Sequence, residues 1–213
     1  MNTTPAEHLH TCLQQLPLVA ILRGLTPAEA PAIGQALTQA GFGLLEVPLN
    51  SPQPLDSIAA LAAQHPEQLI GAGTVMRAAD VRNVQVAGGR LIISPHFDVE
   101  VVHEALRLDL ACMPGVATPS EALAALRAGA HALKLFPAEM IGPSVVKALR
   151  AVLPPTVPLL PVGGITPDNM AAYRQAGASG FGIGSALYRP GRSAEQTAQA
   201  GQAFIAAWRA TGA

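Results

Sequence analysis

The segment Arg127-Ala128-Gly129-Ala130-His131-Ala132-Leu133-Lys134-Leu135-Phe136-Pro137 contains the unit from which the fold is predicted. Gly129 follows the predicted end of a helix, where a left-handed residue is favoured, and a short apolar run begins just after it. Because this run is strand-sized and ends at Pro137, we interpret it as a buried strand. The same Ala-Gly ending precedes an apolar run at three other places: Gln39-Ala40-Gly41, Val86-Ala87-Gly88 and Gln175-Ala176-Gly177.

Strands and helices are predicted to alternate along the whole chain. Together with the run at 131–137, strands are expected at 17–22, 44–47, 69–73, 91–94, 110–113, 158–162 and 181–184. This pattern predicts an α/β fold, a single (β/α)8 TIM barrel over residues 1–213, with an extra N-terminal helix before the first strand. An open doubly wound sheet is the alternative, and it is disfavoured because no Gly-x-Gly-x-x-Gly follows the first strand.

Thr-Pro pairs mark several predicted helix starts. Thr26-Pro27, Thr118-Pro119 and Thr166-Pro167 each combine an N-cap residue with proline, which is favoured at the first helical position. Asp98 is a further predicted N-cap, for a helix that ends near Leu108.

Composition excludes several classes of function. Half of the 213 residues are hydrophobic, yet no apolar run approaches the roughly 20 residues of a membrane span, and the N-terminus has no signal-peptide pattern. We therefore expect a cytoplasmic protein. A net charge of −1 and an aromatic content of 4% argue against nucleic acid or an anionic membrane as a partner. Cys12 and Cys112 have no disulfide or metal-site spacing, and we expect two free thiols.

In a parallel barrel, the active site gathers at the carboxyl ends of the strands. Selecting residues by that position alone, without regard to type, yields an arginine, a glutamate, a lysine and two glycine-rich segments. The residues so selected are Arg23, Glu46, Thr74, Ser94-Pro95, Pro114-Gly115, Lys134, Gly163-Gly164 and Ser185.

Two of these strand ends predict a phosphate site. Gly163-Gly164 and Gly184-Ser185 would let backbone N–H groups approach phosphate oxygens, with the Ser185 hydroxyl as another donor. Either of these glycine-containing segments alone could serve only a tight turn. Their occurrence at adjacent strand ends favours a phosphate-binding site.

Lys134 and Glu46 interrupt otherwise apolar strands. Burial lowers the pKa of an amine and raises that of a carboxyl, which suits Lys134 to forming a Schiff base and Glu46 to acid–base catalysis. Arg23 could bind a carboxylate with its planar fork. The alternative is a structural ion pair among these three residues, which would not exclude catalysis. His96 has no partner at metal-ligand spacing, so no metal or other cofactor is predicted.

At these residues the chain resembles the KDPG/KHG aldolase family. The matching segments are 19–24, 45–52, 70–75, 132–137, 161–165 and 184–185. The resemblance implies that Lys134 is the Schiff-base lysine and Glu46 its acid/base. It also implies that Arg23 and Thr74 surround pyruvate, and that Gly163, Gly164 and Ser185 bind phosphate.

The loop Pro48-Leu49-Asn50-Ser51-Pro52 departs from the Arg-Thr pair usual in phosphogluconate-specific members. It resembles the branch that cleaves 2-dehydro-3-deoxy-6-phosphogalactonate, a phosphorylated keto-deoxy sugar acid, to pyruvate and D-glyceraldehyde 3-phosphate. Family resemblance also implies a homotrimer. The alternatives are an aldolase for the gluconate epimer, or a phosphate-binding barrel that acts as an isomerase, a synthase or a sensor.

Overall fold

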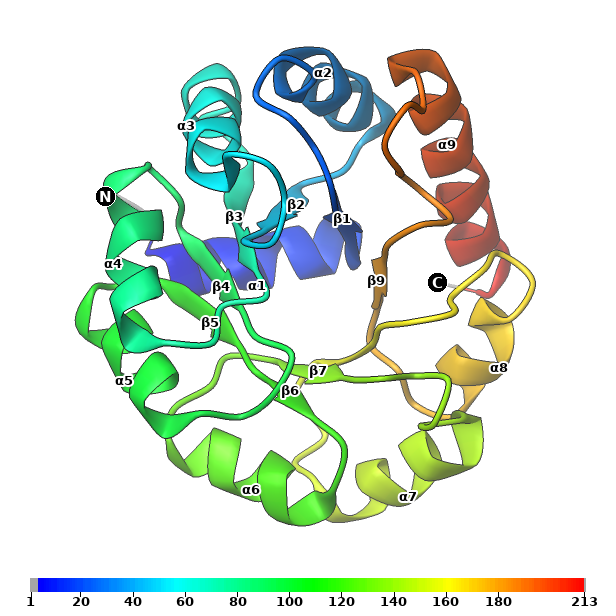
Figure 1. Ribbon diagram of the computed structural model, residues 1–213. Coiled ribbons are helices and arrows are strands. Elements are labelled where there is room, and N and C mark those ends of the chain that lie inside the picture. Colours follow the sequence, from blue (N-terminus) through cyan, green and yellow to red (C-terminus); the bar gives the residue numbers. More distant parts are fainter. Residues whose placement is uncertain (1–3, 213) are drawn as a thin grey trace.

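The computed structural model describes residues 4–212 and shows parallel strands surrounded by helices (Figure 1). The strands are β1 (Leu18–Ile21), β2 (Leu44–Pro48), β3 (Leu69–Gly73), β4 (Leu91–Ile93), β5 (Ala111–Met113), β6 (Gly115–Val116), β7 (Leu133–Leu135), β8 (Leu159–Pro161) and β9 (Phe181–Ile183). The helices are α1 (Pro5–Gln15), α2 (Ala30–Ala40), α3 (Pro54–Gln64), α4 (Ala78–Val86), α5 (Val99–Arg107), α6 (Pro119–Arg127), α7 (Pro143–Val152), α8 (Met170–Gln175) and α9 (Ala194–Ala210).

The strands form two parallel sheets. One has the order β5-β4-β3-β2-β1-β9 and the other the order β6-β7-β8. A single parallel bridge between Val162 and Gly182 links the end of β8 to β9. On the other side, only Pro114 separates β5 from β6, and proline has no N–H to donate to a neighbouring strand. The predicted α/β class with parallel strands is confirmed. The predicted fifth strand, 110–113, corresponds to β5, and β6 is a further short strand after Pro114 that was not predicted.

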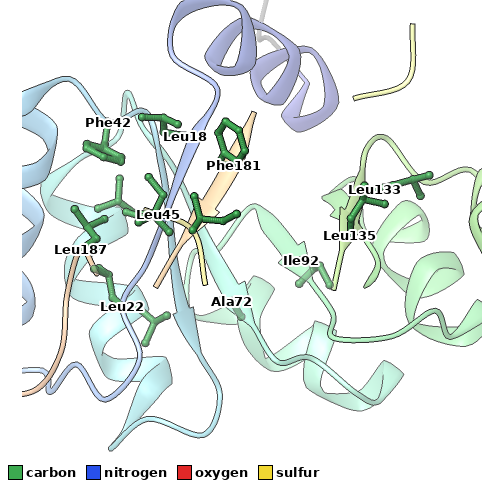
Figure 2. Close-up of a cluster of buried hydrophobic side chains, with 14 of the residues drawn as sticks. Leu18, Leu22, Phe42, Leu45, Ala72, Ile92, Leu133, Leu135, Phe181 and Leu187 are labelled. Atoms are coloured by element: carbon green, nitrogen blue, oxygen red, sulfur yellow. The ribbon is translucent and has the colours of Figure 1, made fainter. Parts of the chain in front are cut away.

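Strand side chains alternate between two separate apolar clusters, as the pleat requires. Leu45, Leu133 and Phe181 belong to the cluster between the strands and the outer helices (Figure 2). Their neighbours Leu44 and Ala132 belong to the second cluster, on the opposite face of the strands. The same alternation assigns Glu46 and Lys134 to the face of this inner cluster, one step toward the carboxyl ends.

Helix α1 covers the amino ends of the strands. Its Leu9 and Cys12 join the inner cluster with Val19, Leu44 and Leu69, which lie at or near the start of β1, β2 and β3. In Figure 1 this helix lies across the strands rather than in the outer ring. The inner cluster is thus covered at its amino end, and the polar residues at the carboxyl ends face the other way.

Some predicted helix starts are correct and others are wrong. Thr118 caps α6 with a full capping box, and Asp98 caps α5, as predicted. Thr26 does not cap α2, which begins at Ala30, because its N–H and hydroxyl donate to the Glu29 carboxylate in a preceding turn.

Thr166 likewise does not cap α8, which begins at Met170. Its N–H donates to the Asn169 side chain at 3.0 Å, so the chain makes a turn before the helix starts. Cys12 and Cys112 are free and buried. Within residues 4–212, none of the helices combines the length and the apolar character that a membrane span needs.

Candidate active site

Glu46 is a buried carboxyl group in the middle of β2. Its side chain is 1% exposed, and its Oε2 has no hydrogen-bond partner among the described residues. Burial raises the pKa of Glu46, and the positive charges of Lys134 and Arg23 act in the opposite direction. Because its pKa is raised, this carboxyl group holds a proton more readily than an exposed glutamate does, which suits it to acid–base chemistry.

Gly73 makes room for this carboxyl group. It ends β3 beside β2, and a Cβ at this position would overlap the Glu46 carboxyl atoms. Gly73 is therefore part of the wall that fixes the position of the carboxyl group.

Lys134 lies in β7 and is 4% exposed. Its register partners are Gly115 of β6 and Leu160 of β8, so no charged residue lies beside it in the sheet. Burial lowers the pKa of Lys134; Glu46 raises it and Arg23 lowers it further. Its Nζ lies 4.9 Å from the centroid of the Phe136 ring, a favourable contact for the ammonium form. The environment thus brings the neutral, nucleophilic amine closer to neutral pH.

Arg23 follows β1 and is exposed at the mouth formed by the strand ends. Its Nη1 donates a hydrogen bond of 2.8 Å to Oδ1 of Asn50. Among residues 4–212, no ion pair joins Arg23, Glu46 and Lys134 to one another. The structural ion pair considered from the sequence is therefore not formed, although the charges of the three residues influence one another.

Thr74 follows β3 with a φ of 59°, a left-handed conformation that is unusual for a β-branched residue. Strained residues of this kind cost of order 1–3 kcal/mol and cluster at functional sites. The left-handed backbone of Thr74 is therefore a second reason, besides its position at a strand end, to include it in the site.

The predicted phosphate site lies where β8 and β9 meet. Gly163 and Gly164 have φ values of 112° and 60°, which glycine adopts without steric cost. The bridge between Val162 and Gly182 brings the segment that follows β8 beside the segment that ends in Ser185. Asn169 further fixes the first loop, because its Nδ2 donates to the Gly164 carbonyl at 2.8 Å.

The sequence-predicted residues divide into two groups. Arg23 lowers the pKa of both Glu46 and Lys134, Glu46 and Lys134 shift each other's pKa, and Gly73 links Thr74 to Glu46. The phosphate-site residues form the second group, on β8 and β9. Within residues 4–212 there is no group of three or more His, Cys, Asp or Glu side chains that could hold a metal ion.

Four neighbours of these residues were given no role from the sequence. They are Gly73, Asn50, Phe136 and Glu139, whose side chain would meet a Cβ added at Gly163 or Gly164. Gly73 and Phe136 each lie within two residues of a predicted site residue, Thr74 and Lys134 respectively. Period-two alternation, continued past the end of β7, could have placed Phe136 on the face of Lys134.

The sequence from residue 9 to residue 201 matches the family model described as KDPG and KHG aldolase. The chain belongs to this aldolase family. It is 47% identical to the 2-dehydro-3-deoxy-6-phosphogalactonate aldolase of Escherichia coli (strain K12), over 92% of this chain and 96% of that protein.

Solved structures of the family are also similar to this aldolase. A structure described as native KDPGal has a TM-score of 0.91 and 47% identity, and the match covers 92% of this chain and 96% of that chain. The KDPG aldolase of Legionella pneumophila, with pyruvate captured as a covalent carbinolamine intermediate, has a TM-score of 0.79. It is 27% identical, with 99% of both chains covered.

Proposed function

We propose that the protein is a class I aldolase that cleaves 2-dehydro-3-deoxy-6-phosphogalactonate to pyruvate and D-glyceraldehyde 3-phosphate. The observation that carries the proposal is a buried lysine on β7 and a buried glutamate on β2, 4% and 1% exposed, on the inner faces of the two parallel sheets and without a direct ion pair. The substrate assignment is supported by the loop 48–52 and by the name of the E. coli relative. The carbinolamine in the Legionella relative supports a covalent route.

The proposed reaction begins with attack of the neutral Lys134 amine on the C2 ketone. Glu46 supplies the proton with which the carbinolamine loses water, and a protonated imine results. Glu46 then takes the proton of the C4 hydroxyl, so the C3–C4 bond breaks and its electron pair passes to the imine as an enamine. Protonation at C3 and hydrolysis release pyruvate and free the lysine.

The other predicted residues hold the two ends of the substrate in this proposal. Arg23 and Thr74 bind the carboxylate end, and Gly163, Gly164 and Ser185 bind the phosphate. Fixing both ends orients the scissile bond over the imine, which lowers the barrier by removing the entropy cost of alignment.

Borohydride trapping tests the covalent step. Reduction in the presence of pyruvate should add mass irreversibly to the peptide that contains Lys134, and not to the peptide that contains Lys147. Absence of an adduct, or unchanged turnover in Lys134→Ala, would exclude this mechanism. Turnover measured on the galactonate and gluconate epimers tests the substrate assignment, and a preference for gluconate would overturn it.

We further propose that the two sheets close into one (β/α)8 barrel with α1 as an extra helix, and that residues 1–213 form one domain. The bridge at Gly182 and the short break at Pro114 support closure. Amide hydrogen exchange tests it, because closure predicts slow exchange at His131 and Ser179, whose N–H groups donate to Cys112 of β5 and Leu159 of β8 across the two junctions between the sheets.

A homotrimer is proposed as well, with the cytoplasm as its location. Met76, Val99 and Met140 are 53%, 45% and 80% exposed, which is unusual for apolar side chains of their size. Light scattering should give the mass of three chains, and a mass of one chain would refute the trimer.

A further inference from the structure

We propose that Asn50 is a positioning residue, whose amide oxygen holds the Arg23 guanidinium where it can receive the carboxylate of the substrate. This inference rests on the proposed aldolase function, in which Arg23 binds that carboxylate. Asn50 lies in the loop after β2 and is exposed at the same mouth as Arg23.

The hydrogen bond between the two side chains defines the orientation of both. Arg23 Nη1 donates to Asn50 Oδ1 at 2.8 Å, and within residues 4–212 this is the only hydrogen bond of the Arg23 side chain. A guanidinium has donors and no acceptor, so the amide must turn its oxygen toward Arg23. An exposed arginine otherwise samples many rotamers, and restricting them costs conformational entropy. The hydrogen bond to Asn50 restricts the Arg23 side chain in the free enzyme, so less entropy is lost when the substrate binds.

The backbone fixes Asn50 relative to Arg23. Gly24 N–H donates to the Ser51 hydroxyl at 2.9 Å, so the residues that follow Arg23 and Asn50 are joined as well. Ser51 is 8% exposed, and its own N–H donates to the Pro48 carbonyl at 2.9 Å. The hydrogen bonds accepted by Asn50 and Ser51 therefore join the loop after β2 to the loop after β1, next to the ends of these two paired strands.

The chemistry of the amide suits this role. A carboxylate in place of Asn50 would also hold Arg23, but it would neutralise the charge that the substrate carboxylate needs. The neutral amide orients the guanidinium and leaves its charge and its other N–H groups available. That charge reaches the reacting groups, since Arg23 lowers the pKa of both Glu46 and Lys134.

The test compares Asn50→Ala with Arg23→Ala and with the double variant. Asn50→Ala should raise KM for the substrate about fivefold, the effect of losing one exposed hydrogen bond to a charged group, with kcat within about twofold. The pyruvate concentration that half-saturates borohydride trapping should rise by a similar factor. In the Arg23→Ala background, Asn50→Ala should change neither quantity, because Asn50 acts through Arg23.

Two further variants separate positioning from a structural role. Asn50→Asp is nearly isosteric and keeps the acceptor, so a structural role would leave KM unchanged, whereas we expect KM to rise because the charge of Arg23 is cancelled. Asn83→Ala, an exposed asparagine on α4, is the matched control and should behave as wild type. Thermal unfolding of each variant confirms that the compared proteins are folded.

The outcomes distinguish this inference from the proposed function. If Arg23→Ala raises KM while Asn50→Ala does not, or if the effects of the two changes multiply, the positioning role is wrong and the aldolase assignment stands. If the unaltered protein forms no lysine adduct with pyruvate and cleaves neither epimer, the proposed function fails and the inference fails with it.

Discussion

Replacing Gly73 by alanine should displace the Glu46 carboxyl group and lower activity, although Glu46 itself is unchanged. The added Cβ would lie 2.6 Å from Cδ and 2.8 Å from Oε2 of the Glu46 carboxyl group, where ordinary contacts begin at 3.4 Å. Gly73 is not among the residues with positive φ, so alanine suits its backbone. The overlap with Glu46 is therefore the main effect of the substitution.

The size of the effect follows from the displacement. Oε1 of Glu46 lies closest to the added Cβ, and restoring ordinary contact with it requires the carboxyl group to move by about 1 Å. A misplacement near 1 Å costs about 100-fold in rate. We expect kcat/KM to fall about 100-fold, equivalent to about 2.7 kcal/mol in the barrier. Overpacking at a buried position should also lower the free energy of unfolding by about 1–3 kcal/mol.

Steady-state cleavage with pyruvate detection, together with urea unfolding, measures both effects. Gly142→Ala is the control, because Gly142 has a φ of −63° and no atom within 4 Å of an added Cβ; it should keep wild-type kcat/KM. Glu46→Asp in the Gly73→Ala background retracts the carboxyl group by one methylene, so it should restore stability while activity stays low. Wild-type kcat/KM in a cooperatively folded Gly73→Ala variant would refute the role given to Glu46.

Three other substitutions have defined expectations. Thr74→Gly removes the strain at φ 59°, so urea unfolding should show stability within about 1 kcal/mol of wild type, while kcat/KM falls at least about tenfold. The pKa of Glu46 is raised above 4.5, so the folded state binds more protons than the unfolded state. The free energy of unfolding should therefore fall as the pH rises through the raised pKa. Urea unfolding at several pH values measures this slope, and Glu46→Gln should lack it. Arg150 donates hydrogen bonds to the carbonyls of Pro154, Val157 and Gly177. Arg150→Met should therefore lower the free energy of unfolding by about 2–3 kcal/mol. A change below about 0.5 kcal/mol in urea unfolding would contradict this expectation.

The sequence was sufficient to predict eight of the nine strands within residues 4–212 and to identify Glu46 and Lys134 as buried charged residues. The third buried charged residue, Glu104, was not identified. Parallel strands place their carboxyl ends together, and a period of two places Glu46 and Lys134 on one face, so no distant contact needed to be known. The short strand β6 was missed, because the predicted fifth strand ended at Met113, before Pro114.

Contacts between loops could not be predicted in this way. The bond from Arg23 to Asn50 depends on the register that pairs Ile21 with Glu46, and register is a property of the folded sheet. The starts of α2 and α8 were mispredicted for a local reason. Glu29 and Asn169 accept hydrogen bonds from the threonines expected to be caps, and the choice between these competing turns is not readable from composition.

Helix α1 has a kinetic consequence for the proposed reaction. Because Leu9 and Cys12 cover the amino end of the inner cluster, both fragments must leave through the mouth at the carboxyl ends. The aldehyde fragment is free as soon as the carbon–carbon bond breaks, whereas the three-carbon fragment stays attached to Lys134 until water hydrolyses the imine. Departure is therefore sequential, and pyruvate should inhibit by occupying the free enzyme, competitively with the six-carbon substrate.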